Sequence, residues 1–167
     1  KDSISRFDIL AHRLLSYAKP RGFAMEHVDL NQVVERVAAL LEPHFAVSRV
    51  ALNIAASERR AFILGDEGRL EHLIVNLAVN GLHALNPGGR LDISVEADES
   101  WVDLWVADNG PGIAPEIRDR LFEPFSSTRA DGFGLGLYSC RQIVQEHGGK
   151  LDCESEPGVG PRFYVQL

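Results

Sequence analysis

Two glycine-rich stretches constrain this chain more than any other feature of its sequence. The first, Asp108 to Ile113 (DNGPGI), follows an apolar run at residues 101–107 that predicts a strand. The second, Gly132 to Leu137 (GFGLGL), leads into a helical pattern over residues 135–147. A carboxylate at a strand end can accept from an amino group, and glycines let a flat ring approach the backbone. Since free N–H groups at a helix N-terminus bind phosphate, the two stretches together predict a nucleotide site.

A third polar element lies upstream, inside a long helical pattern, at Asn76 to Asn80. Asn76 and Asn80 are four residues apart, so they share one face of that helix. Asparagine is a poor helix former because its amide competes with backbone hydrogen bonds, so two on one face need a reason. Two interpretations are open. The amides are either solvated or capping groups, or oxygen ligands for a hard cation that bridges phosphates.

Hydrophobic periodicity predicts the remaining elements of the main domain. Helices are expected over residues 31–41, with Asp29 as N-cap, 66–85 and 135–147. Strands are expected over residues 50–55, 61–64, 90–97, 101–107, 150–154 and 162–167, with 90–97 and 101–107 forming a hairpin. Residues 113–134 have a weak apolar pattern and one short expected helix at 115–121, which is typical of a lid over a site.

The N-terminal segment has a different pattern. Residues 3–19 predict an amphipathic helix whose apolar side chains alternate in steps of three and four, at Ile4, Phe7, Ala11, Leu14 and Ala18. This spacing is that of a helix-pairing seam, and Pro20 ends the helix. We therefore expect a seam helix at 1–19, a linker at 20–28 and a main domain at 29–167.

Composition excludes several classes of function. The formal net charge of −7 argues against a non-specific nucleic-acid surface, so no nucleic-acid partner is expected. Cys140 and Cys153 lack metal-ligand spacing, and two reduced thiols fit a cytoplasmic domain. No apolar run is long enough to span a membrane, although the anchoring of a parent protein stays open.

The motifs, taken in order, resemble the boxes of sensor histidine kinases. Residues 76–80 resemble the N box, 108–112 the G1 box, 122–129 the F box and 132–137 the G2 box, and residues 146–160 follow the closing pattern of that family. The order and spacing match from Asp29 to Leu167. The resemblance implies a Bergerat-type α/β fold shared with gyrase, the heat-shock protein 90 class and MutL-like ATPases. That fold is a two-layer sandwich in which three helices cover one face of a mixed, mostly antiparallel sheet.

The resemblance also implies ATP and Mg²⁺ as cofactors and assigns roles at the adenine and metal ends. Asp108 would accept from the adenine amino group, which would exclude guanine, because guanine carries a carbonyl there. Asn80 would bind Mg²⁺ through its side-chain oxygen, and Asn76 would support the phosphate end. Gly110, Gly112 and Ile113 would lie along the base.

Further site residues follow from the same resemblance. His83 lies on the face of Asn80, near the phosphates, with a surface histidine as the alternative. Arg129 would reach the γ-phosphate, with an unpaired lid charge as the alternative. Phe122 and Phe125 would anchor the lid in an apolar groove. The G2-box residues expected at the phosphates and lid hinge are Gly132, Gly134, Leu135, Gly136 and Leu137.

Three positions depart from the family pattern. Phe133 stands where Thr or Ser is common, which removes a hydroxyl contact to phosphate. The pair Pro161-Arg162 replaces small hydroxyl residues before the last strand, with local consequences expected. His72 stands where Gln is common, and nothing in the sequence explains that change.

The implied function is transfer of the ATP γ-phosphate to a histidine, with Asn76, His83 and Arg129 in catalytic roles. The alternatives are an ATPase of the same fold or a nucleotide-binding regulatory module. Such ATPases place Glu at the position of Asn76, which cannot accept a proton from water. The implied partners are the phosphoacceptor helix of a parent kinase, which would be a homodimer, and the receiver domain of a response regulator. None of the 6 histidines precedes an acidic residue, so this chain alone is not expected to phosphorylate itself.

Overall fold

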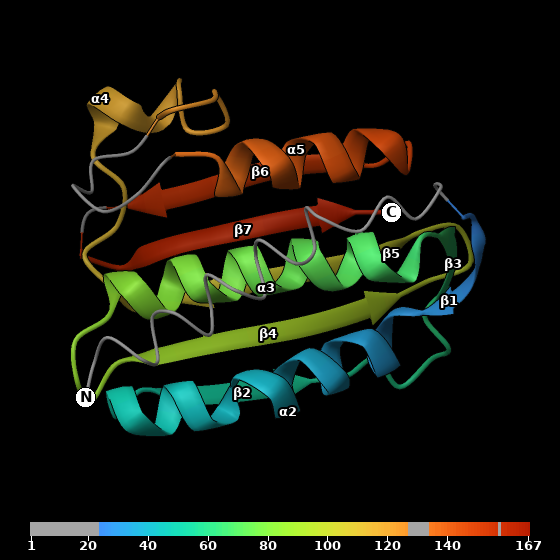
Figure 1. The fold of residues 1–167 in the computed structure, drawn as a ribbon, viewed down its shortest axis with the longest axis horizontal. Coiled ribbons are helices and arrows are strands. Elements are labelled where there is room, and N and C mark those ends of the chain that lie inside the picture. The colour runs from blue at the N-terminus through green and yellow to red at the C-terminus, as the bar shows by residue number, and fades with distance from the viewer. Residues whose placement is uncertain (1–23, 127–133, 157) are drawn as a thin grey trace.

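A five-stranded sheet forms one layer of the molecule and lies behind the helices in Figure 1. The computed structural model describes residues 24–126, 134–156 and 158–167. Its strands lie in the order β2-β4-β5-β7-β6, in which β2 pairs with β4 in parallel and the other pairs are antiparallel. Their bounds are Ala51–Ala55 (β2), Arg90–Ala97 (β4), Val102–Asp108 (β5), Lys150–Glu156 (β6) and Gly160–Gln166 (β7).

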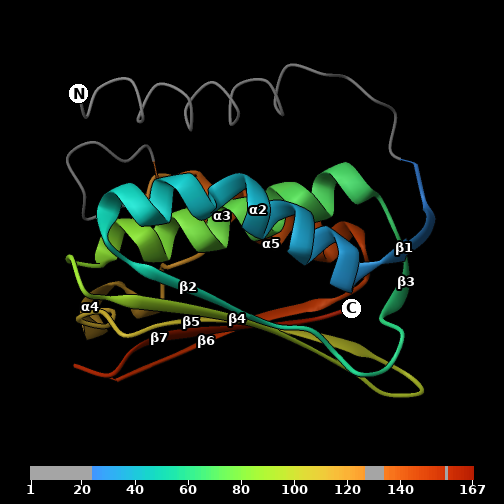
Figure 2. The same ribbon diagram turned by 90° about the horizontal axis from the view of Figure 1, so that it is seen from below.

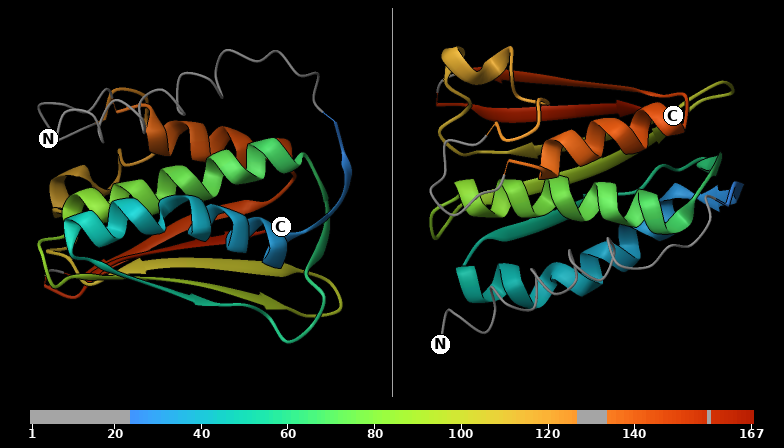
Figure 3. Two further views of the ribbon diagram at one scale, coloured as in Figure 1. Left: turned by 60° about the horizontal axis from the view of Figure 1, so that its bottom comes forward. Right: turned by 45° about the horizontal axis from the view of Figure 1, so that its top comes forward.

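Three helices cover one face of this sheet, as Figure 2 shows from below. They are α2 (Leu30–Ser48), α3 (Glu67–Ala84) and α5 (Gly136–Glu146). Helix α3 contacts both of the others and lies between them (Figure 3). The fold predicted from the motifs, a two-layer sandwich on a mostly antiparallel sheet, is therefore confirmed.

The alternating strands explain where the core lies. In β4 and β5 every second side chain faces the helices and is buried, because successive residues of a strand point to opposite faces. The open face instead carries polar and aromatic side chains. There the Arg162 guanidinium lies 3.8 Å from the centroid of Trp105, and Trp105 contacts Tyr164 at 4.3 Å between centroids. The unusual Arg162 thus packs on its own sheet, and the effect of this departure is local, as expected.

Side-chain caps fix where two helices begin. Asp29 accepts from Asn31 N–H at 3.1 Å at the start of α2, which confirms the predicted N-cap. Asp66 accepts from Arg69 N–H at 3.0 Å at the start of α3. After the C-terminus of α5, Gly148 adopts φ +69°, a left-handed conformation that ends the helix.

Three boundary predictions were wrong. Strand β1 (Glu26–Asp29) begins inside the predicted linker and pairs antiparallel with β3 (Phe62–Gly65). Helix α2 continues through Pro43 to Ser48 because tertiary packing buries Phe45 completely. Helix α4 covers only Pro115–Arg118.

Some predictions fall outside the described residues. The seam helix and most of the linker lie there, as do Arg129, Gly132 and Phe133. Among the helices that the structure describes, none has the length and apolar character needed to cross a bilayer.

Candidate nucleotide site

Asp108 ends β5 as a buried carboxylate, with a side chain only 7% exposed. Gly110 N–H donates to its Oδ1 at 2.9 Å. Burial raises the pKa of Asp108 to about 6, and the bond from Gly110 offsets only part of that rise. Within the described chain Gly110 is its one hydrogen-bond donor, so the carboxylate retains capacity to accept from a ligand.

Gly81 brings helix α3 close to this carboxylate. A Cβ placed on Gly81 would lie 3.3 Å from Asp108 Oδ2 and 2.1 Å from Leu91 Cδ1, so no larger residue fits without movement. The sequence analysis did not single out Gly81. Its position directly after Asn80 was the available signal, because a glycine inside a helix usually marks a close approach.

Asn76 and Asn80 meet the N-terminus of α5. A Cβ placed on Gly136 would lie 3.7 Å from Asn76 Oδ1 and 3.8 Å from both polar atoms of the Asn80 amide. Asn76 is 1% exposed, and its Nδ2 has no hydrogen-bond partner among the residues the structure describes. A solvated amide is therefore the wrong interpretation for Asn76.

The first turn of α5 has no side-chain cap from its own N-cap residue, Leu135. A helix N-terminus without such a cap presents backbone N–H groups and the positive end of its dipole. The two amides, the helix end and Asp108 belong to elements that pack on one another, since α3 contacts both α5 and β5.

The loop after Asp108 packs against the end of β6. Ile113 N–H donates to Ser155 Oγ at 2.8 Å. A Cβ on Gly112, where φ is +84°, would lie 2.7 Å from Glu156 O, so glycine is required there. The sequence analysis placed Gly110 and Gly112 in the site but did not predict the contact of Ile113 with Ser155. The two residues are far apart along the chain, so no local pattern indicates that they meet.

The other predicted site residues have varied environments. His83 lies in the last turn of α3 and is exposed. Phe122, Ile113 and Leu137 are partly buried and pack against the core. Phe125 is 76% exposed, so its predicted anchoring in an apolar groove is wrong in this structure. Phe125 also adopts φ +62°, a left-handed conformation that is uncommon for a residue other than glycine.

Gly134 is required for the fold at the base of the predicted lid. Phe125 N–H donates to Gly134 O at 3.1 Å. A Cβ on Gly134, where φ is +65°, would lie 2.5 Å from the carbonyl carbon of Phe125. Phe125 and Gly134 are therefore in direct backbone contact.

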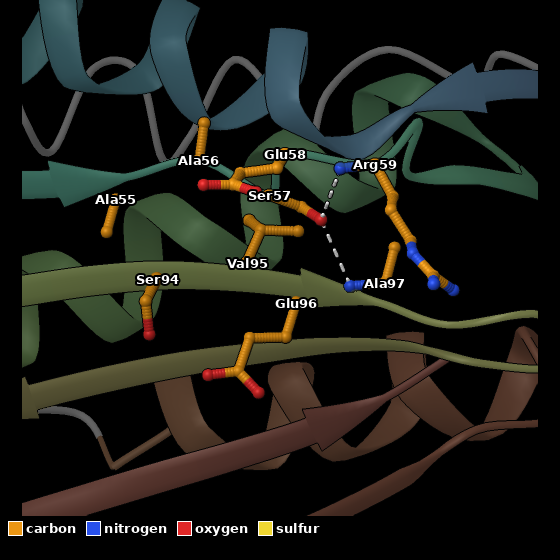
Figure 4. A pocket seen from close by; sticks show the side chains of 9 residues that line it. All are labelled: Ala55, Ala56, Ser57, Glu58, Arg59, Ser94, Val95, Glu96 and Ala97. Carbon is orange, nitrogen blue, oxygen red and sulfur yellow. Dashed lines mark hydrogen bonds between the residues drawn. The ribbon is translucent and has the colours of Figure 1, made fainter.

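A cavity of about 370 Å³ lies at the opposite end of the sheet, between residues 55–59 and 94–97 (Figure 4). Ser57 Oγ accepts there from the N–H groups of Arg59 and Ala97, both at 3.2 Å. Asn31 Nδ2 donates to Ser57 O, and Ser57 N–H donates back to Asn31 Oδ1. Ser57 and Asn31 thus bond to each other and to nearby backbone, and the charged side chains that line the cavity, Glu58, Arg59 and Glu96, are exposed.

Comparison with known proteins agrees with the motifs. The model of the family described as histidine kinase-, DNA gyrase B- and HSP90-like ATPase matches residues 65–167. The sensor histidine kinase ZraS of Klebsiella oxytoca is 35% identical over 163 residues, which cover 97% of this chain and 35% of ZraS. The chain spans about a third of the length of the curated relatives that it matches.

Solved structures match over most of the fold. Full-length ShkA in complex with AMPPNP has a TM-score of 0.78 and 30% identity, covering 99% of this chain and 36% of ShkA. The catalytic domain of histidine kinase ThkA has a TM-score of 0.77 and 26% identity, covering 86% of this chain and 94% of that domain. With its sheet, its covering helices and the family match in agreement, the chain belongs to the histidine kinase-, DNA gyrase B- and HSP90-like ATPases.

Proposed function

We propose that this domain binds Mg-ATP and donates the γ-phosphate to a histidine of a sensor kinase. The observation that carries the proposal is the junction of α3 and α5, where the buried Asn76 amide faces the uncapped N-terminus of α5. The unpartnered atom of Asn76 is Nδ2, which is a donor. A buried donor without an acceptor is costly, and an oxygen of a bound phosphate would supply that acceptor.

The adenine end rests on Asp108. Its ionised carboxylate would accept from the exocyclic amine of adenine, while guanine would present a carbonyl and leave two acceptors facing each other. Gly110, Gly112 and Ile113 form the adjoining backbone, which contacts Ser155 and Glu156 at the end of β6.

The phosphate end rests on backbone and amides. N–H groups of Gly134, Leu135, Gly136 and Leu137 would face the phosphates at the start of α5, with Gly132 and Phe122 on the lid side. Amide oxygens suit Mg²⁺, so Asn80 would hold the ion and Asn76 would support it. Mg²⁺ would neutralise phosphate charge. His83 and Arg129 would contact the γ-phosphate.

Phosphoryl transfer is preferred to hydrolysis because Asn76 cannot act as a general base towards water. The acceptor would be a histidine of a dimerisation domain, and the phosphate would pass on to the receiver domain of a response regulator. In this proposal residues 1–19 are the end of the dimerisation hairpin, a linker follows from residue 20 up to the start of β1, and the parent is a cytoplasmic homodimer. The similarity to sensor histidine kinases and to ShkA solved with AMPPNP supports this assignment.

Calorimetric titration of the chain with ATP, ADP and GTP, each with and without Mg²⁺, tests the nucleotide site. We expect ATP and ADP to bind, ATP more tightly with Mg²⁺, and GTP not to bind. Equal affinity for ATP and GTP would overturn the role of Asp108. Acid-labile labelling of a separate dimerisation fragment by radiolabelled ATP tests the transfer.

A further inference from the structure

We propose that Ser155 is a positioning residue for the nucleotide, whose buried hydroxyl holds the loop from Asp108 to Ile113 in the shape that receives the base. This inference deepens the proposed function and rests on it. Ser155 lies in β6, far from Asp108 in sequence, and would not touch the ligand itself.

The first observation is the bond from the Ser155 side chain to the loop. Ser155 is 7% exposed, and its Oγ accepts from Ile113 N–H at 2.8 Å. Pro111 has no N–H, so the loop has few donors with which to fix itself. The bond to Ser155 therefore fixes the end of the loop that lies farthest from β5.

The second observation is how tightly backbone packs on backbone around that bond. Gly158 N–H donates to Pro111 O at 3.1 Å. A Cβ on Gly160, where φ is +94°, would lie 1.8 Å from Asp108 O. Gly158 and Gly160 thus pack directly on the backbone of the loop from Asp108 to Ile113. A displacement of these glycines would therefore displace the loop.

The third observation joins the next segment to the same residue. The Arg118 side chain, on α4, donates to the backbone carbonyl of Ser155. Ser155 therefore holds the loop through its hydroxyl and α4 through its carbonyl. Since α4 begins the predicted lid, Ser155 lies where the base-binding loop and the lid meet.

These contacts predict an effect on affinity rather than on the adenine contact itself. Without the hydroxyl, the loop would spend part of its time in shapes that do not admit the base, and the apparent Kd would rise as the competent fraction falls. Asp108 would remain on β5, because its strand pairing does not depend on Ser155.

The experiment compares three variants of the chain by ATP titration, thermal unfolding and amide hydrogen exchange. Ser155→Ala removes the hydroxyl, and Ser155→Thr keeps it. Ser57→Ala is the matched control, because Ser57 Oγ likewise accepts from backbone N–H groups (Figure 4) but lies at the far end of the sheet. We expect Ser155→Ala to weaken ATP binding by about ten-fold and to speed exchange at Ile113.

Ser155→Thr should restore most of the affinity, and Ser57→Ala should lower the unfolding temperature with unchanged affinity. Wild-type affinity in Ser155→Ala, or an equal loss in Ser155→Thr, would overturn the positioning role. An equal loss in Ser57→Ala would show a general effect of stability and would overturn it too. If the wild-type chain binds no adenine nucleotide, the proposed function fails first, which separates the two failures.

Discussion

An aspartate lies near each end of helix α3: Asp66 is its N-cap, and Asp108, at the end of β5, lies beside its last turns. The two carboxylates differ in the hydrogen bonds that they accept. At its N-terminus, Asp66 accepts from Arg69 N–H at 3.0 Å and from Ala24 N–H at 3.1 Å. Burial raises the pKa of Asp66, but these backbone donors outweigh burial and lower the pKa below its ordinary value. Near the C-terminus of α3, burial dominates and raises the pKa of Asp108 to about 6.

Other polar groups along α3 show the same contrast between groups with hydrogen-bond partners and groups without them. His147 joins the start of α3 to α5, with its Nε2 accepting from Asp66 N–H at 3.0 Å and its Nδ1 lying 2.7 Å from Ile143 O. Farther along α3, Asn76 is buried, and its Nδ2 lacks a hydrogen-bond partner in the described chain. Saturated polar groups stabilise a fold, whereas unsatisfied ones mark a place where a ligand completes the bonding.

Asp108→Asn gives the largest expected contrast between the two ends. The substitution replaces the charged carboxylate acceptor by a neutral amide, so ATP affinity should fall about ten- to hundred-fold. The same change removes a buried charge, so the unliganded chain should become more stable by about 1–3 kcal/mol at pH 7. Titration calorimetry and chemical denaturation measure the two effects, and a destabilised variant with normal affinity would reverse the comparison.

The pH dependence of ATP binding should follow Asp108. The ionised form is the acceptor, so affinity should fall about ten-fold between pH 7 and pH 5, as the carboxylate protonates near its pKa of about 6. Asp108→Asn is the control, because its remaining pH response is that of the nucleotide. An identical response in both proteins would show that Asp108 does not titrate in this range.

The stability of the free chain should depend on pH with opposite signs at the two aspartates. The folded pKa of Asp108 is raised, so its unfavourable contribution grows as pH rises from about 4 to 6 and is complete above that range. The folded pKa of Asp66 is lowered, so its favourable contribution is present above the ordinary value of 3.8 and is lost as pH falls. Denaturation curves of Asp108→Asn and Asp66→Asn against pH would separate the two, and parallel curves would contradict the assignment.

Asn80→Ala should lose the Mg²⁺ dependence of ATP binding, with about a several-fold drop in affinity, because one amide ligand to the ion is removed. Titrations with and without Mg²⁺ measure this difference. Circular dichroism should report an intact fold, since Asn80 is only partly buried. Persistence of the Mg²⁺ effect would assign the ion to another residue.

Asp66→Ala gives the smallest expected effect and acts on stability alone. Loss of the α3 N-cap should cost about 1 kcal/mol of unfolding free energy. ATP affinity should stay at the wild-type value, because Asp66 caps the N-terminus of α3, whereas Asn80 lies near its C-terminus. A comparable loss of affinity would show that the two ends of the helix are coupled.

Much of this architecture could be predicted from local patterns. The hairpin of β4 and β5, the cap at Asp29 and the glycine after α5 are short-range signals, and each was confirmed. The motifs also led to the correct family and fold. The roles of the individual site residues remain predictions, and the titrations above are what test them.

The sequence by itself determined most of the strands and helices and the order of the family motifs, because side-chain periodicity and turn chemistry act within a few residues. Only the tertiary structure decided that α2 runs to Ser48 and that β1 pairs with β3, since packing and strand pairing outweigh local propensity. It alone decided that Asn76 is buried against α5, that Phe125 is exposed, and that Ser155 holds the loop after Asp108. Each of these depends on which distant segments fold against one another, and no spacing along the chain encodes that directly.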